Sequence, residues 1–253
     1  MYKIYTHNFK NNNAFTLIEV AIVLVIIAFI AVSVTVGQEI IQVSKINSIL
    51  SQATKTNAAI NNFRSIYNQL PGDFDKATEY WPIGSEYSGF STADGNNDRK
   101  ISFQNGIGVL SGSEDLRLWQ HLNASDIISG EFSGQLVSGN VILEENLPST
   151  PIEGGGLWMT YDKIYRKEGN MLGFASVNGA NLDNGILTSQ ESWQLDKKGD
   201  DGGASTGYIL IARAAPLDGT TNKCVTGSKS SASVEFDFDD EQKNCRALFI
   251  LDK

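Results

Sequence analysis

The feature that most constrains this chain is an apolar run from Phe15 to Val36 that holds a single ionisable residue, Glu19. A helix of this length can cross the hydrocarbon core of a bilayer. A charged residue at the centre of such a helix costs about 2.5–3.5 kcal/mol on insertion scales. Glu19 lies near the start of the run, so its cost is smaller. It is either a tolerated interfacial carboxylate or a functional group.

The segment before the run, residues 1–14, is polar and carries Lys3 and Lys10 as its formal charges, which is typical of the n-region of a targeting segment. A secretory signal would place a small-residue cleavage site after its apolar run, and no A-x-A site follows here. The small residue at the polar-to-apolar junction is Ala14. Cleavage after Ala14 would make Phe15 the new amino terminus and would keep the apolar run.

Residues 14–19, AFTLIE, resemble the processing site of type IV prepilins and type II secretion pseudopilins, which more often have Gly before the cut. The resemblance covers about the first 40 residues. It implies that a prepilin peptidase cleaves between Ala14 and Phe15 and that Phe15 is N-methylated. It also implies that Glu19 pairs with the amine of a neighbouring subunit's first residue. Such a pair at 4 Å is worth about 4 kcal/mol at an effective dielectric near 20, before desolvation is subtracted.

The chain after the run continues as an amphipathic helix. Between residues 39 and 67 the apolar residues recur at spacings of three and four, and they are Ile46, Ile49, Leu50, Ala53, Ile60, Phe63 and Tyr67. Because no Pro precedes Pro71, the apolar run and this stretch can form one helix that ends at LPGD, residues 70–73. A signal anchor followed by a separate helix is the alternative.

Residues 71–253 contain every Pro and most of the Gly, and this length is enough for one domain with its own core. Apolar or alternating runs predict strands at 136–143, 157–161, 171–177, 207–214, 233–238 and 247–251. Two short helices are predicted, at 113–122 with Ser113 as its cap, and at 188–195 with a Thr188–Glu191 capping box.

We therefore expect a leader at 1–14, a long helix at 15–70 that spans the membrane at 15–36, and a C-terminal domain at 71–253. The fold class is α+β, with the long N-terminal helix packed on a mainly antiparallel sheet. This is also the architecture that the resemblance to pilins implies.

Charge and cysteine content bear on partners and compartment. The net charge of −9 argues against nucleic-acid binding, which needs Lys and Arg to displace counterions. Cys224 and Cys245 lie in a domain expected to be exported, and an oxidising compartment favours a disulfide between them. Two buried free thiols are the alternative. A disulfide here would also resemble the closing loop of many pilins.

The sequence DGNNDRKIS, residues 94–102, resembles the first nine positions of an EF-hand loop. The candidate calcium ligands are Asp94, Asn96, Asp98, the carbonyl of Lys100, and Ser102. Arg99 stands where the motif has Gly, and Asn105 stands where it has Glu, although Glu114 or Asp115 could supply a distant ligand. The alternative is a plain Asx-rich turn.

A second acidic group, Asp196, Asp200 and Asp201, has no recognisable ligand spacing, and we expect an ordinary loop there.

The sequence offers little support for a catalytic function. The chain after the leader holds one histidine, His121, for which we expect a structural role. EGGGLW at 153–158 lacks the Lys of a phosphate-binding loop. We expect a protein that is not an enzyme.

Two function classes remain. The first is a structural subunit of a type IV pilus or type II secretion pseudopilus. The resemblance then implies other pilin or pseudopilin subunits, a prepilin peptidase, an inner-membrane assembly platform and the lipid bilayer as partners. It also implies a single-pass bacterial inner-membrane protein with a periplasmic C-terminal domain, later part of a periplasmic or cell-surface filament. The second class is a membrane-anchored exported binding module or adhesin that shares only the anchor.

Overall fold

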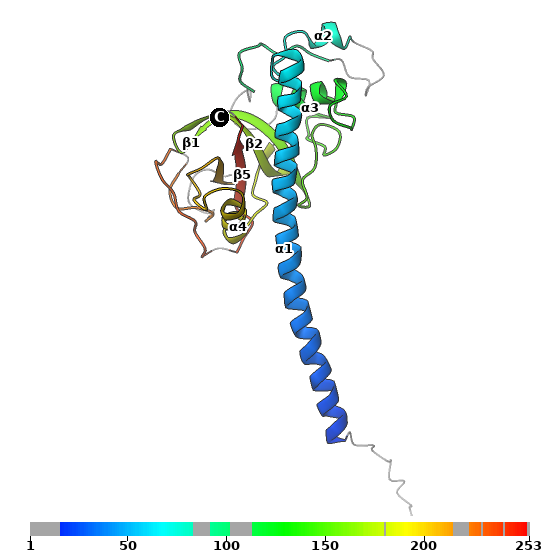
Figure 1. Ribbon diagram of the computed structural model, residues 1–253, viewed down its shortest axis with the longest axis vertical. Coiled ribbons are helices and arrows are strands. Elements are labelled where there is room, and N and C mark those ends of the chain that lie inside the picture. Colours follow the sequence, from blue (N-terminus) through cyan, green and yellow to red (C-terminus); the bar gives the residue numbers. More distant parts are fainter. Residues whose placement is uncertain are drawn as a thin grey trace, which may run out of the picture. The chain divides into compact units, whose positions relative to one another are not determined.

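The computed structural model describes residues 16–82, 92–101, 113–179, 181–214, 223–228, 230–239 and 241–251 (Figure 1). The chain divides into two compact units, Met1–Ser44 and Lys45–Lys253. Helix α1, Leu17–Tyr67, contributes its first part to unit 1 and its last part to unit 2. The predicted leader boundary at residue 14 lies outside the described residues and stays a prediction.

The first part of α1 exposes its apolar side chains. Leu17 is 93 % exposed and Phe29 is 72 % exposed, and the large apolar residues between them are also exposed. Leu17–Val34 is long and apolar enough to cross a membrane, by length and composition. A continuous apolar surface of this kind is typical of a segment that lipid or another protein covers.

The last part of α1 belongs to the core of unit 2. Ile46, Ile49, Ala53, Ile60 and Phe63 are buried in that core, and Leu50 and Tyr67 pack against it in part. This is the face that the spacing of three and four predicted. A fully buried Ile or Phe stabilises a fold by about 1.5–3 kcal/mol, so this face fixes the helix to its domain.

Helix α1 ends three residues earlier than the sequence analysis expected. Asn68 has a φ of 57°, the left-handed conformation that commonly follows a helix end, and its N–H donates to the carbonyl of Arg64. The predicted end at the LPGD turn was therefore wrong, because Asn68 terminates the helix before Pro71.

The sheet of unit 2 contains β1 Gly155–Ile164, β2 Lys167–Asn178, β3 Asn181–Asn184, β4 Ile209–Arg213 and β5 Cys245–Ile250. The order is β1-β2-β5-β4, with β3 also paired to β2, and all of these pairs are antiparallel. β5 lies between β2 and β4, which accounts for its apolar sequence. Together with α1, the sheet confirms the predicted α+β class with a long N-terminal helix.

Three shorter helices complete the described fold: α2 Ala77–Tyr80, α3 Glu114–Ala124 and α4 Ser189–Gly199. α3 contacts β1, and α4 contacts β4 and β5. The predicted capping box of α4 is confirmed, since Thr188 Oγ1 accepts from the N–H of Glu191 and the Glu191 carboxylate accepts from the N–H of Thr188. Ser113 precedes α3 without a capping bond and donates instead to Asp115.

Two predicted strands were wrong. Within 136–143, Ser138 and Gly139 both have positive φ and form a tight turn, bridged by Val137 and Asn140. Within 233–238, pairing is limited to one bridge, between Phe236 and Val225. Alternation of apolar residues therefore does not show whether a segment has a partner strand, and these two segments form only isolated bridges.

Candidate functional site

The N-terminus of α1 is closed by a capping box. Glu19 Oε2 accepts hydrogen bonds from the N–H and the hydroxyl of Thr16, both at 2.8 Å. Thr16 Oγ1 in turn accepts from the N–H of Glu19 at 3.3 Å. This reciprocal pattern satisfies two backbone donors that a helix start would otherwise leave unpaired. The spacing T-x-x-E would have predicted it, and the sequence analysis missed it.

The other predicted processing residues, Ala14 and Phe15, lie outside the described residues. Within those residues, the site consists of the Thr16–Glu19 cap and the exposed apolar helix that follows it. An acidic side chain in the first turn is also favoured by the helix dipole. Glu19 thus has a local structural role besides any role in assembly.

In the loop proposed to bind calcium, Asp94 and Asp98 lie in different surroundings, one bonded to Thr78 and the other close to two further carboxylates. Asp94 accepts from the N–H of Thr78 at 2.8 Å and from its hydroxyl at 3.0 Å. Asp98 joins Asp73 and Glu114, and one carboxylate oxygen of each lies within 4.8 Å of the others. Glu114 is the distant acid that the sequence analysis considered, whereas Asp73 carried no sequence signal.

The remaining proposed ligands hold the loop conformation. Asn96 Oδ1 accepts from the N–H of Asp98 at 2.9 Å, and Asp98 Oδ1 accepts from the N–H of Lys100 at 2.8 Å. The Lys100 ammonium lies 4.5 Å from the centroid of the Tyr161 ring. Ser102 lies outside the described residues. These bonds form consecutive Asx turns, which the Asp and Asn side chains favour.

Asp73 organises this loop from the turn that follows α1. Its carboxylate accepts from the N–H of Asp98 at 3.1 Å and from the N–H of Arg99 at 2.7 Å. Burial raises the pKa of Asp73 to about 6, against the lowering effect of these two bonds. Gly95 passes so close to Asp73 that a Cβ would lie 2.2 Å from its carbonyl carbon, so the loop requires glycine there.

His121 is structural, and both of its ring nitrogens are partnered. Nδ1 accepts from the N–H of Gly72 at 2.9 Å, and Nε2 lies 3.0 Å from the carbonyl oxygen of Ala93. This arrangement fits the neutral tautomer with its proton on Nε2. Burial lowers the pKa of His121 to about 4. The side chain joins α3 to two loops and has no free nitrogen for acid–base chemistry.

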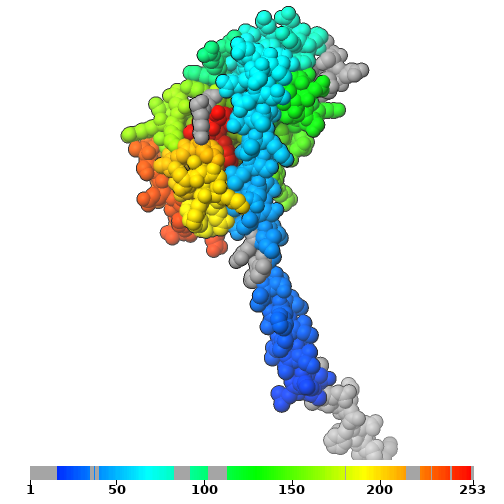
Figure 2. Space-filling view, viewed as in Figure 1, coloured from blue at the N-terminus to red at the C-terminus, as the bar shows by residue number. Residues whose placement is uncertain are grey.

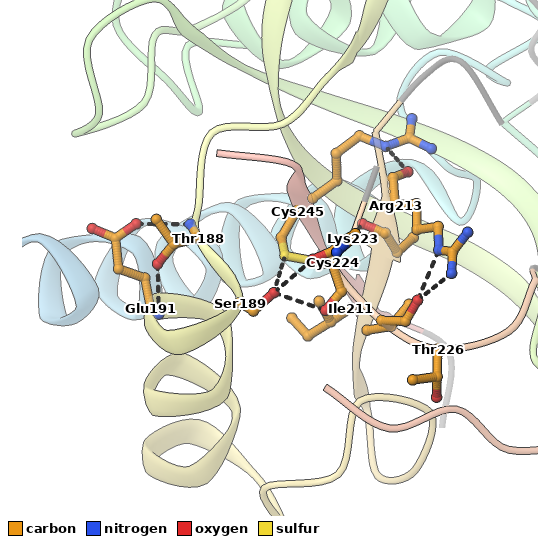
Figure 3. The surroundings of a disulfide bond; sticks show 12 residues. Thr188, Ser189, Glu191, Ile211, Arg213, Lys223, Cys224, Thr226 and Cys245 are labelled. Carbon is orange, nitrogen blue, oxygen red and sulfur yellow. Dashed lines mark hydrogen bonds between the residues drawn. A yellow bond between two sulfur atoms is a disulfide. The ribbon is translucent and has the colours of Figure 1, made fainter. Parts of the chain in front are cut away.

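Cys224 and Cys245 form a disulfide in the structure (Figure 3). Both residues are fully buried. Ser189, the first residue of α4, donates to the carbonyl of Cys224 at 2.9 Å, and its hydroxyl lies 3.7 Å from Cys245 Sγ. The disulfide therefore joins the end of the sheet to the segment that supports the start of α4.

The described N-terminal residues define a class of protein. Such a protein has an apolar helix long enough to anchor it in a membrane, and here Glu19 caps the start of that helix. Residues 9–35 match the family model described as the prokaryotic N-terminal methylation motif. No curated protein and no solved structure matches the chain. The chain therefore carries the N-terminal signature of type IV pilins and pseudopilins, which overlaps the start of its apolar helix.

Proposed function

We propose that the chain is the precursor of a structural filament subunit, of either a type IV pilus or a type II secretion pseudopilus. The observation that carries the proposal is the methylation motif at residues 9–35, which runs directly into the exposed apolar helix that Thr16 and Glu19 cap. A motif without such a helix could not pack into a filament core, and the helix alone would be only an anchor.

In this proposal a prepilin peptidase removes residues 1–14 and methylates Phe15. The apolar helix holds the subunit in the inner membrane, with the C-terminal domain in the periplasm, until an assembly platform adds it to other subunits. The role is structural and not catalytic. The net charge of −9 gives the domain an acidic surface that keeps it soluble outside the membrane.

Glu19 acts in two steps. In the membrane it caps the helix through Thr16, which shields part of its charge. In the filament it accepts from the amine of a neighbouring Phe15. A carboxylate can accept several hydrogen bonds, so the cap does not exclude this second donor. Leaving the amine without a carboxylate in an apolar bundle would cost about 3–5 kcal/mol.

The test is Glu19→Ala, with Glu19→Asp as the charge-conserving control. We expect normal monomer levels, and incorporation into sheared filaments or pulled-down pseudopili reduced by about a hundredfold for Glu19→Ala, since each 1.4 kcal/mol is a factor of ten. Glu19→Asp should be intermediate because its carboxylate is shorter. Incorporation of Glu19→Ala at the wild-type level would contradict the assembly role.

The alternative, an anchored binding module or adhesin, makes a different prediction for the leader. Such a protein would keep Lys3 and Lys10 in its membrane form or would be cut elsewhere. It would also need no neighbouring subunit, so Glu19→Ala would leave its surface display unchanged.

Calcium binding by the loop at 94–102 is a second, separate proposal. The convergence of Asp98 with Asp73 and Glu114 supports it, because three carboxylates offer the hard oxygen ligands that calcium takes. Asp98→Asn should reduce the calcium-dependent rise in melting temperature. No such rise in the wild-type chain would leave the loop as a set of Asx turns.

A further inference from the structure

The C-terminal end of α4 gathers three carboxylates that the sequence analysis assigned to an ordinary loop. Asp196 lies in the last turn of α4, Asp200 is its C-cap residue, and Asp201 follows. One carboxylate oxygen of each lies within 4.8 Å of the others. This group is separate from the loop at 94–102, and no step of the proposed function uses it.

Asp196 distinguishes this group from an exposed acidic turn. Its side chain is fully buried. Oδ1 accepts from the N–H of Gly202 at 2.6 Å, but Oδ2 is shielded from solvent and has no hydrogen-bond partner in the described part of the chain. A buried carboxylate oxygen without a donor is costly, and native proteins rarely leave one unsatisfied.

The loop after α4 supplies donors to the other two acids. Asp200 Oδ2 accepts from the N–H of Ile209 at 2.9 Å and also from the N–H of Tyr208. Asp201 Oδ1 accepts from the N–H of Gly203 at 2.9 Å. The loop is thus folded around the carboxylates and holds them together, while Asp196 Oδ2 is buried without a hydrogen-bond partner among the described residues.

The charge balance of the group is negative. Burial, together with the charges of Asp201 and Asp200, raises the pKa of Asp196 to about 7, against the lowering effect of the bond from the Gly202 N–H. Hydrogen bonds from the Thr206 hydroxyl and the Gly203 N–H lower the pKa of Asp201. The charge of Lys167, which reaches the carbonyl of Gly207 from β2, lowers it further. Lys197 instead lies over the Trp193 ring. The carboxyl end of α4 adds the negative pole of the helix dipole to this group of carboxylates.

We propose that Asp196, Asp200 and Asp201 bind one calcium ion at the C-terminal end of α4, with Asp196 Oδ2 as the central ligand. The group offers oxygen ligands and no imidazole or thiolate, which favours calcium over a transition metal. Calcium also accepts irregular geometry and backbone carbonyls, whereas magnesium demands near-octahedral geometry.

The bound ion would fix the loop between α4 and β4. Gly199 packs so closely on α1 that a Cβ there would lie 2.7 Å from a Leu50 methyl, and it also contacts Ile209. In Figure 2 the yellow surface, which includes the chain around residue 200, lies beside the light-blue surface of the last part of α1. Calcium at this point would therefore stabilise the contact of α4 with the last part of α1, within the same unit.

The experiment is calorimetric titration of the detergent-extracted full chain with CaCl2, after EDTA treatment, and in parallel with MgCl2. We expect a site with a Kd of about 10⁻⁴–10⁻³ M for calcium, the range of exposed extracellular calcium modules. Asp196→Asn should weaken calcium binding at least tenfold. Asp201→Asn, an exposed position at which folding is not at risk, should weaken it similarly. Asp98→Asn is the matched control in the other acidic group and should leave this site intact.

Melting curves distinguish a ligand from a purely structural acid. Without calcium, Asp196→Asn should melt at or above the wild-type temperature, because it removes a charge from a repelling group. In an Asp98→Asn background, which disables the other acidic group, calcium should still raise the melting temperature, and adding Asp196→Asn should abolish that rise. The proposal is overturned if the wild type binds no calcium up to 10 mM, a ceiling about tenfold above the expected Kd range. It is also overturned if Asp196→Asn and Asp201→Asn bind as the wild type does, or if only Asp98→Asn loses binding.

Discussion

Glu19 has a place in the local structure as well as in the apolar run. Its bonds to Thr16 show why a helix start tolerates a carboxylate at this point: the first N–H groups of a helix need acceptors, and lipid supplies none. Glu19 is thus more than an isolated charge in an apolar segment. The proposed pairing of Glu19 with the Phe15 amine of a neighbouring subunit is a separate role, and it requires the Glu19 carboxylate to be charged.

His121 gives a prediction at the scale of one residue. Its pKa is about 4 in the folded chain against 6.5 for the free side chain, so between these pH values the unfolded chain binds a proton that the folded chain does not. The free energy of unfolding therefore falls as pH decreases through this window. His121→Gln keeps a donor and an acceptor and should lose this dependence, which amounts to about 3 kcal/mol between pH 7 and pH 4.

The measurement is urea unfolding of the full chain, followed by tryptophan fluorescence at several pH values, for the wild type and His121→Gln. The comparison between the two is essential, because burial raises the pKa of Asp73 and Asp115 to about 6 and about 7. These acids change stability in the opposite direction, and the difference between variants cancels them. Parallel pH profiles would show that His121 does not titrate as stated.

At the scale of elements, helices were more predictable than strands. The buried face of α1 follows from spacing alone, because a helix places residues three and four apart on one side. The strand at 136–143 failed because Ser138 and Gly139 turn the chain back, which apolar alternation does not reveal. β3, Asn181–Asn184, holds one large apolar residue and pairs with the end of β2 directly before it, whereas the segment near Phe236 alternates but makes only one bridge, to Val225.

The acidic groups show the same limit at the site level. Spacing identified Asp98, but Asp73 joins it from a turn 25 positions earlier, and only the fold places them together. Likewise, the sequence contains Asp196, Asp200 and Asp201, yet the burial of Asp196 Oδ2 is a property of tertiary packing. The Thr16–Glu19 cap is the opposite case, because its spacing was present in the sequence.

The disulfide gives a prediction at the scale of elements. Because Cys224 and Cys245 are both buried, alkylation must be done in denaturant to separate a disulfide from shielded thiols. Protein from its native compartment should take up no alkyl group before reduction and two after it. A double Cys→Ala variant should lose about 3 kcal/mol of the free energy of unfolding, because the disulfide joins two residues that are 21 positions apart in the sequence. Two labels before reduction would show free thiols.

At the scale of the whole molecule, the chain combines two units suited to different environments. Unit 1 exposes an apolar helix, and unit 2 buries its apolar residues around an antiparallel sheet. A chain with this division can be held in a bilayer by one unit while the other folds in water. The methylation motif at the start of the helix is the feature on which the proposal of a filament subunit rests.

The most direct test of the central claim is the intact mass of the protein extracted from membranes, with sequencing of its N-terminal peptide. The account predicts a mature form that has lost residues 1–14 and begins with an N-methylated Phe15. Deletion of the prepilin peptidase should restore the full-length mass. A mature protein that still carries Lys3 and Lys10 in cells with an active peptidase would contradict the account.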